Sequence, residues 1–321
     1  MRLFLFASLA AIASAQQCDR ACLNGWVDKY LEAVVAHDAK RLPITANVKY
    51  TENGQRLNLD DGFWNTATAI GTYKLYVPDV RMGNAAFIGT MREAGAAVTV
   101  GLRLKVENGK IPEIETIVIR NPTAAANIEK SGSPRKALTE SLPADKRVSR
   151  DKLVETANKY FTGMMLNDGK GDYPFADDCN RFENGGQSTN APTPAGQSRP
   201  DPKTAKGYSA QWSCKEQFES GLLHFVSRIR DRRYVAVDEE RGLVFALAFF
   251  DHDAGKSRNF KTPDGREVSA GPQRPWTWEI AEVFKVYDGK LHEIEAILQE
   301  VPYGMLSGWS NWEDGLSTRI R

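Results

Sequence analysis

The sequence predicts an α+β protein made of two tandem copies of one unit, in which helices precede and pack on an antiparallel sheet. Three observations predict it: an amphipathic helix occurs twice, an Asn-Gly turn follows each helix, and a strand–turn–strand pattern ends each copy. Helices followed by several strands are typical of the α+β class. Because similar segments recur in the same order, we interpret the mature chain as a duplication.

Residues 1–15 have the pattern of a signal peptide: Arg2 is followed by the apolar stretch Leu3–Ile12 and the cleavage site Ala13-Ser14-Ala15. This apolar stretch is too short to span a bilayer, which takes about 20 residues. We expect a mature chain that starts near Gln16 and is secreted, to the periplasm if the source is bacterial. An uncleaved anchor or a buried helix is the alternative.

The first unit is predicted over residues 16–122. Its first helix carries apolar residues at the helical spacing i, i+3, i+4, i+7. The expected elements in order are a helix over Leu23–Val35, a turn at Asn53-Gly54, a helical segment over Phe63–Tyr76, and strands over Ala85–Met91, Val98–Val106 and Ile114–Ile119.

A linker over residues 123–148 precedes the second unit, residues 149–321; part of this linker is expected to be a short helix. The second unit repeats the element order and adds two loop insertions, Ser188–Ser209 and Asp253–Pro275, both rich in turn residues. Its expected elements are a helix over Leu153–Met165, a turn at Asn184-Gly185, a helix over Cys214–Arg230, and strands over Leu243–Phe250, Trp276–Tyr287 and Ile294–Leu298.

The strongest internal match joins Lys105–Glu115 to Lys285–Glu295, where seven of eleven positions are identical at an offset of 180 residues. Each copy has a strand, an Asn-Gly or Asp-Gly turn and a second strand, which predicts a hairpin. Earlier matches have offsets of 130 and 131 residues. The offset only grows, so the second copy carries insertions and keeps the element order.

Composition restricts the partners. The net charge is +1 and no basic run is present, which argues against nucleic acid, since phosphate binding needs clustered Lys and Arg. No second apolar stretch suits a membrane span. Walker, dinucleotide-binding, Gly-x-Ser-x-Gly and His-Glu-x-x-His motifs are absent, so we expect no cofactor and no metal. The expected partner is a small aromatic organic molecule, bound by a monomer or a homodimer.

The four cysteines, Cys18, Cys22, Cys179 and Cys214, form an even set in an exported chain, which favours two disulfides. Three pairings are possible. We favour Cys18–Cys22 with Cys179–Cys214, because this pairing keeps each bridge inside one unit. A metal site at Cys18 and Cys22 is the weaker alternative, because no His follows at a suitable spacing.

The element order, with each unit ending in strand, Asp-Gly-Lys-Leu and strand, resembles the nuclear transport factor 2-like fold in its SnoaL-like branch. That resemblance implies two cones, each with helices on a curved antiparallel sheet around a pocket. Four second-unit segments also resemble an exported fungal and bacterial family of uncharacterised domains, some of which resemble cofactor-independent β-aryl etherases acting on lignin-like dimers. These segments are Cys179–Gly185, Val237–Val244, Phe249–His252 and Pro302–Met305.

Asp251 and His252 are the first candidates for chemistry, because they end the apolar strand Leu243–Phe250 beside an insertion. Histidine moves protons near neutral pH. Strand alternation allows only one of the two to face a pocket. The first unit has Glu93-Ala94 at the aligned positions and lacks the His, which favours activity in the second unit. A plain surface turn is the alternative.

Further candidates are charged. Arg181 and Glu183 would share one face of a strand, where they could pair or bind a substrate oxygen, with Asn184 beside them. Because the first unit keeps Glu52 and Asn53, a structural turn held by an ion pair is the favoured interpretation. Glu295 on the last strand could be a general base if it faces the cone interior, and Glu282, within the apolar run Ile280–Phe284, could act likewise. Each is otherwise the polar side of a strand.

Aromatic residues are dense in the second unit. Trp276 and Trp278 share one face of a strand and could stack on an aromatic ligand, although most such rings are expected to be core. Trp212 and Trp276, beside the insertions, are the preferred ligand contacts. Tyr303 and the helical His224 complete the expected binding set, with packing as the alternative for His224.

The sequence therefore favours a secreted, cofactor-free enzyme that acts on a small aromatic-containing molecule through acid–base chemistry in the second unit. The resemblance suggests cleavage of a lignin-type β-aryl ether. A secreted binding module without catalysis and a SnoaL-like cyclase or isomerase of natural-product biosynthesis are the alternatives.

Overall fold

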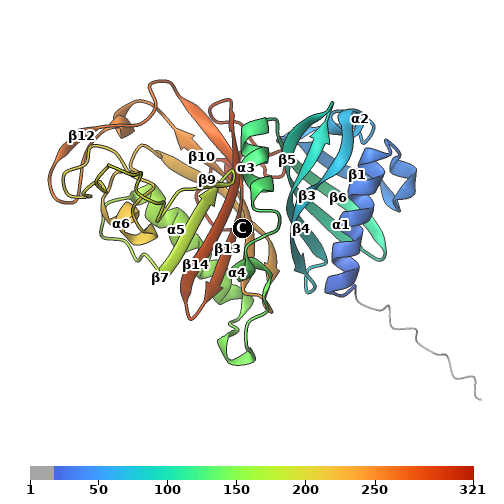
Figure 1. The fold of residues 1–321 in the computed structure, drawn as a ribbon. Helices are drawn as coiled ribbons and strands as arrows, with labels where there is room; N and C mark the ends of the chain where they lie inside the picture. The colour runs from blue at the N-terminus through green and yellow to red at the C-terminus, as the bar shows by residue number, and fades with distance from the viewer. Residues whose placement is uncertain (1–17) are drawn as a thin grey trace, which may run out of the picture.

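The computed structural model describes residues 18–321, so the expected signal peptide lies outside the described residues. The described chain forms two units, each with a six-stranded sheet and a long helix on one face (Figure 1). The α+β class and the two tandem units expected from the repeat are confirmed. The long helices lie on the outer sides of the two sheets, which face each other at the centre.

In the first unit, helix α1 (Arg20–Val35) begins where the Asp19 side chain accepts a hydrogen bond from the backbone N–H of Cys22 at 2.8 Å. One stripe of α1, which includes Leu23, Val27 and Tyr30, is buried against the sheet, as expected for an amphipathic helix. The other elements are a 3₁₀ turn (Ala39–Arg41), β1 (Ile44–Glu52), β2 (Gln55–Arg56), α2 (Phe63–Thr66), β3 (Ala67–Asp79), β4 (Asn84–Glu93), β5 (Ala96–Glu107) and β6 (Lys110–Ile119).

In the second unit, helix α5 (Arg150–Leu166) begins at the cap residue Ser149 and ends at Asn167, whose φ of 39° stops the helix. Its buried stripe, which includes Tyr160 and Phe161, packs into the core of this unit. The other elements are β7 (Phe175–Glu183), β8 (Gly186–Gln187), α6 (Cys214–Glu219), β9 (Arg228–Asp238), β10 (Leu243–His252), β13 (Trp276–Tyr287), β14 (Lys290–Val301) and α7 (Trp312–Gly315).

Each sheet is mixed and not purely antiparallel, which corrects the expectation. The strand orders β2-β1-β6-β5-β4-β3 and β8-β7-β14-β13-β10-β9 are equivalent. The first long strand of each unit runs parallel to the last, β1 beside β6 and β7 beside β14, and the other pairs are antiparallel. Side chains alternate between the two faces in the same way along parallel and antiparallel strands, so the sequence pattern could not predict the parallel pair.

Two predicted helices are wrong. In Phe63–Tyr76, helix ends at Thr66 and the remainder is β3, in which Tyr73, Leu75 and Val77 are buried at the strand period of two. In Cys214–Arg230, helix ends at Glu219 because Gly221, with φ of 70°, breaks it. The expected apolar helix face around Leu222 to Ile229 is therefore a turn followed by the start of β9.

The two insertions form one lobe beside the second sheet. Ser188–Ser209 has no helix or strand, and Asp253–Pro275 contains a 3₁₀ turn (Lys256–Arg258) and a small hairpin, β11 (Asn259–Lys261) with β12 (Glu267–Ser269). A core of Trp212, Leu222 and Val268 joins the insertions to the unit. The first unit has no counterpart of this lobe.

The two sheets pack face to face through a buried apolar layer that includes Leu75 and Ile117 of the first unit and Phe245 and Ile297 of the second. The segment between the units is partly helical, with α3 (Pro122–Lys130), α4 (Lys136–Thr139) and a 3₁₀ turn (Ala144–Lys146). Ile128 of α3 and Leu138 of α4 join the same apolar layer. Each sheet is therefore covered on one face by the long helix of its own unit and on the other face by the opposite unit.

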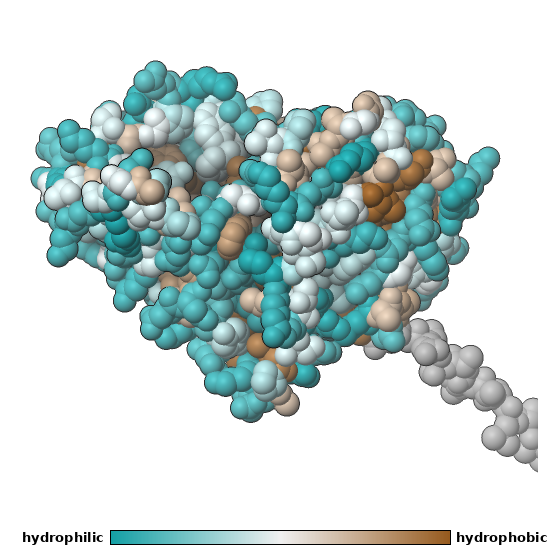
Figure 2. Space-filling view, viewed as in Figure 1, coloured by the Kyte–Doolittle hydropathy of each residue, from teal (hydrophilic) through white to brown (hydrophobic). Residues whose placement is uncertain are grey.

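Both expected disulfides are present, Cys18–Cys22 and Cys179–Cys214. Two disulfides fit an oxidising, extracellular environment. None of the helices within residues 18–321 is long and apolar enough to cross a bilayer. The face shown in Figure 2 is mostly hydrophilic, with apolar residues in small patches.

A larger residue at Gly101 should destabilise the packing of the two sheets. A Cβ there would lie 3.0 Å from Ile297 Cδ1 and 3.3 Å from the Ala281 Cβ across the interface. We expect Gly101→Val to lower the free energy of unfolding by about 1–3 kcal/mol through overpacking, measured by chemical denaturation. Ala97→Val, on the same strand but half-exposed, is the control, and an equal effect in both variants would contradict close sheet packing.

Candidate functional site

A narrow cavity lies in the second unit between α5 and the face of the sheet that α5 covers. The volume inside the cavity is about 20 Å³, which is room for about one water molecule, so a larger ligand requires the wall to open. Most of its wall is apolar: Met164, Leu223, Phe225, Val226, Phe250, Trp278, Ile280, Ala296 and Leu298. Its polar wall residues are Tyr160, Arg181, Glu183, Tyr208 and Glu282. The lining suits a small, mainly apolar ligand that carries one polar group.

Arg181, on β7, is the buried cation of this cavity, with 2% of its surface exposed. Its guanidinium donates hydrogen bonds to Gln217 Oε1 at 2.7 Å, Ser188 Oγ at 3.0 Å and the Tyr160 hydroxyl at 3.4 Å. Burial alone would lower the pKa of Arg181, but Tyr160 and the nearby carboxyl groups raise it, so the guanidinium stays charged.

Glu183 lies two residues beyond Arg181 and shares its strand face, as predicted. Its Oε1 atom is 3.2 Å from Arg181 Nε, and the pair forms part of the cavity wall. Asn184, which follows, has a different role. Its side chain exchanges two hydrogen bonds of 3.0 Å with the backbone of Leu298, as Asn53 does with Val118 in the first unit. Asn184 is therefore a turn residue common to both units.

Glu282, on β13, is the second carboxyl group of the cavity. It is 2% exposed, and its Oε2 atom has no hydrogen-bond partner within residues 18–321. Burial raises the pKa of Glu282 to about 8, although the Arg181 guanidinium opposes the shift. At neutral pH, Glu282 is thus a protonated acid beside an ionised arginine. A neutral carboxylic acid in an apolar site can donate a proton to a ligand.

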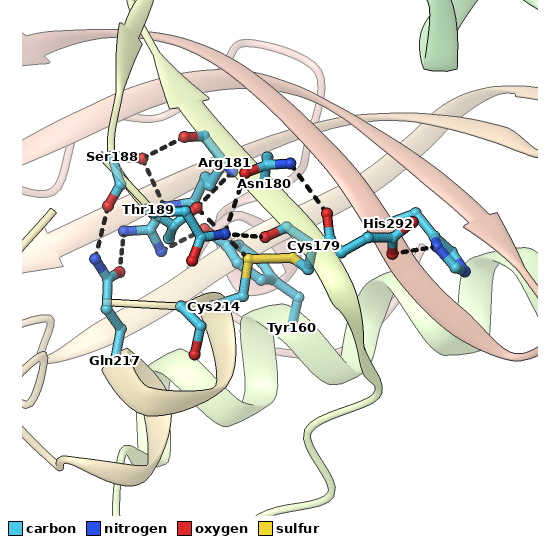
Figure 3. The surroundings of a disulfide bond; sticks show 12 residues. Tyr160, Cys179, Asn180, Arg181, Ser188, Thr189, Cys214, Gln217 and His292 are labelled. Carbon is cyan, nitrogen blue, oxygen red and sulfur yellow. Dashed lines mark hydrogen bonds and ion pairs between the residues drawn. A yellow bond between two sulfur atoms is a disulfide. The ribbon is translucent and has the colours of Figure 1, made fainter. Parts of the chain in front are cut away.

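The disulfide Cys179–Cys214 ties the strand that carries Arg181 to the helix that carries Gln217 (Figure 3). Gln217 accepts the hydrogen bond from Arg181, and its Nε2 atom donates to the carbonyl oxygens of Ser188 at 2.6 Å and Ser209 at 2.8 Å. These hydrogen bonds engage both ends of the Gln217 amide. The disulfide and Gln217 together hold Arg181 in one position.

The first unit keeps the same framework and, at Glu52, the counterpart of Glu183, but it lacks the other two charged groups. On the last strand of the second unit, Ile294 pairs with Arg181 and Ala296 pairs with Glu282. The residues of the first unit equivalent to Ile294 and Ala296 are Ile114 and Thr116. Ile114 pairs with Tyr50, and Thr116 pairs with Leu102. Tyr50 therefore stands in place of Arg181, and Leu102 in place of Glu282. The fold forms without Arg181 and Glu282, which indicates that the second unit carries these two groups for another purpose.

His252 and Asp251 do not line the cavity, although the His252 ring packs against Trp278 and Phe225 of its wall. His252 is buried between aromatic rings, 4.0 Å from the Trp276 ring and 4.8 Å from the Trp278 ring, measured between centroids. Burial lowers the pKa of His252 to about 4, so it is uncharged at neutral pH. Asp251 faces the other way and binds Arg230 through two hydrogen bonds of 2.8 and 3.0 Å.

Glu295 is on the face of its strand that meets the first unit and does not line the cavity. It accepts hydrogen bonds from the Tyr73 hydroxyl at 2.6 Å and from Arg135 at 2.9 Å. Glu115, its counterpart, accepts two hydrogen bonds from Arg233 at 2.7 and 2.8 Å. Glu295 therefore joins the second unit to β3 of the first, and Glu115 joins the first unit to β9 of the second.

Of the expected ligand-binding aromatic residues, Trp278 alone lines the cavity. Trp212 is buried in the core of the insertions, where its Nε1 donates to the carbonyl of Pro200 at 2.7 Å. His224 is in the turn before β9, with its ring 5.0 Å from that of Phe260, and Tyr303 is half-exposed outside the cavity wall. Within residues 18–321, no three His, Cys, Asp or Glu side chains group as metal ligands.

Sequence reasoning missed Tyr208 and gave Glu282 only secondary rank. Tyr208 lies in a Ser-, Pro- and Gly-rich insertion, where no periodicity indicates which side chain turns inward. A signal for Glu282 was available, because aligning the two copies sets it against Leu102. A charged residue in one copy, opposite an apolar residue in the other, indicates a site that the fold does not require.

Comparisons with known proteins place both units in one family. The sequence model described as "Domain of unknown function (DUF8021)" matches residues 16–118 and 146–298. No curated protein matches the chain. Among solved structures, a de novo designed protein with a curved β-sheet matches 47% of this chain and 88% of its own, at 13% identity and a TM-score of 0.25.

Replacing Glu282 should change how stability depends on pH. The pKa of Glu282 in the folded protein is about 8, above the ordinary value of 4.5. As the pH rises, the unfolded chain therefore releases this proton at a lower pH than the folded protein does. Glu282 consequently lowers the free energy of unfolding progressively between about pH 4.5 and pH 8. We expect Glu282→Gln to raise the melting temperature at pH 8 and to change it least near pH 4.5, measured by calorimetry. A constant difference across this range would contradict a protonated, buried Glu282.

Loss of the Cys179–Cys214 disulfide should destabilise the second unit more than loss of Cys18–Cys22 affects the first. The two bridges span 35 and 4 residues, and a longer loop constrains the unfolded chain more. We expect the double Ser variant at Cys179 and Cys214 to lose about 2–4 kcal/mol in chemical denaturation. Equal losses in the two double variants would contradict this prediction.

Proposed function

Because the chain belongs to the DUF8021 family through two tandem copies, we propose from its own geometry that the second unit is a cofactor-free acid–base enzyme. Its substrate is a small aromatic-containing molecule, and the reaction breaks a C–O bond by addition of water. The observation that carries the proposal is the protonated, buried Glu282 in an aromatic-lined cavity that also holds the Arg181–Glu183 pair.

The proposed reaction uses the two carboxyl groups in opposite roles. Glu282 donates its proton to the ether oxygen as the C–O bond breaks, so the aryl group leaves as a phenol. The Glu183 carboxylate accepts a proton from a water molecule whose oxygen forms the new bond to carbon. The products are a phenol and an alcohol, and proton exchange with water restores both carboxyl groups.

Arg181 holds two side chains of the cavity wall in place. Its Nε atom lies 3.2 Å from Glu183 Oε1 and holds that side chain at the cavity wall. Arg181 also donates a hydrogen bond to the Tyr160 hydroxyl, which orients the Tyr160 side chain at the cavity wall. A β-aryl ether of the lignin type matches this set of groups, because it offers a phenoxide leaving group and aromatic rings for the apolar wall.

We further propose that each unit is a cone of the nuclear transport factor 2-like fold in its SnoaL-like branch, and that the chain is secreted. The helix-covered sheet with an inner cavity supports the cone, and the two disulfides support export to an oxidising compartment. A secreted module that holds the ligand without turnover is the second candidate. It is favoured by the existing contact between Glu183 and Arg181, which occupies the proposed base.

The test is incubation of the purified protein with a β-aryl ether dimer, without added cofactor, and measurement of phenol release by liquid chromatography. We expect release to fall by about 10²–10⁴-fold in Glu282→Gln, the usual contribution of a general acid. Release should also decline above about pH 8, where Glu282 loses its proton.

The matched control is Glu279→Gln. Glu279 is on the same strand, is also buried, and has a pKa raised by burial to about 7, but it faces the other unit. This variant should keep full activity. Equal loss in both variants would contradict the assignment of Glu282, and ligand-induced stabilisation without phenol release would favour the binding module.

A further inference from the structure

The insertion Ser188–Ser209 covers the mouth of the second unit's cavity. Its residue Tyr208 is 42% exposed and also lines the cavity, so the cavity reaches the surface at this side chain. The Tyr208 ring lies 5.9 Å from that of Phe225, centroid to centroid, at an interplanar angle of 32°. Two aromatic rings at the mouth present π-faces to any ligand that enters.

Tyr208 shares the cavity wall with Arg181 and Glu183. The pKa of Tyr208 is raised, first by burial of the hydroxyl and then by the Glu183 carboxylate, while Arg181 opposes the shift. The hydroxyl is therefore within electrostatic reach of both charges. Within residues 18–321 it makes no hydrogen bond, so its donor and acceptor are free for a ligand.

The insertion is anchored at both ends through Gln217. This fully buried amide donates to the carbonyl oxygens of Ser188 and Ser209, at either end of the insertion, and accepts from Arg181. The far side of the insertion is held by the second insertion, where Arg266 donates to the carbonyls of Pro202, at 2.9 Å, and Ala205. The position of the insertion and that of Arg181 are thus coupled through one side chain.

We propose that Ser188–Ser209 is a lid on the cavity, that Tyr208 is its ligand contact for a phenolic or aryl-ether ring, and that Gln217 latches the lid to Arg181. This inference rests on the proposed function for the site but concerns ligand entry and ring recognition. An aryl ring packs against the adjacent rings of Tyr208 and Phe225, and its oxygen substituent meets the Tyr208 hydroxyl near the Arg181–Glu183 pair.

The test measures binding of 4-nitrophenol to the full chain by difference absorbance, with association and dissociation rates from stopped flow. Tyr208→Ala is expected to weaken binding about threefold to tenfold, mostly through faster dissociation, because one face of the ring loses its stacking partner. Tyr208→Phe should keep most of the affinity. Tyr303→Ala, at a tyrosine of similar exposure outside the cavity wall, is the matched control and should bind like the parent.

A second measurement follows the lid itself. Trypsin can cleave the insertion at Lys203 and Lys206, and bound 4-nitrophenol should slow that cleavage in the parent protein but not in Tyr208→Ala. Unchanged affinity and rates in Tyr208→Ala would overturn the proposal, as would a parent protein that fails to bind the probe at millimolar concentration. Both measurements record binding and not turnover. They can therefore contradict the lid while the proposed Glu282 chemistry stands, or support the lid while that chemistry fails.

Discussion

A guanidinium in the interior of the second unit is the constraint around which that unit is arranged. Burying a charge is costly unless hydrogen bonds and opposite charges compensate it. Arg181 obtains this compensation from Tyr160 on α5, Ser188 on the insertion, Gln217 on α6 and Glu183 on its own strand. One side chain thus connects the helix, the sheet, the insertion and the disulfide-linked α6.

The first unit shows what the fold needs without this charge. There Tyr50 and Leu102 stand where the second unit has Arg181 and Glu282, and Trp64 packs edge-on against Tyr30 at 5.5 Å. The first unit is a version of the same framework without Arg181 and Glu282, and its sheet covers the face of the second sheet that is turned away from α5. The two copies therefore differ at this site: Arg181 and Glu282 are present only in the second.

Much of the framework was predictable from sequence. The repeat, the two long helices, the last hairpin of each unit and both disulfides follow from periodicity, turn residues and cysteine spacing. The site was predictable only in part, through Arg181 and Glu183. Alternation along a strand identifies an inner face when the other face meets water, but every residue of β10 is buried, because both sides of the sheet are covered.

For that reason alternation could not tell Glu295, which lies between the sheets, from Glu282, which faces the cavity. The same double burial conceals the environment of His252, where a strand-end histidine proves to be enclosed by indole rings. Tyr208 was beyond prediction for a different reason. Its place at the cavity mouth depends on hydrogen bonds from Gln217, distant contacts that no local pattern encodes.

The proposed chemistry depends on Glu282 being a protonated acid at neutral pH. Carbon-13 NMR of the protein labelled at glutamate side-chain carboxyl carbons measures this directly, with the Glu282→Gln spectrum used to assign the resonance. The structure predicts a titration midpoint near pH 8, because burial outweighs the attraction of Arg181. A midpoint near the ordinary glutamate value of about 4.3 would show that Glu282 is ionised and would contradict its role as the acid.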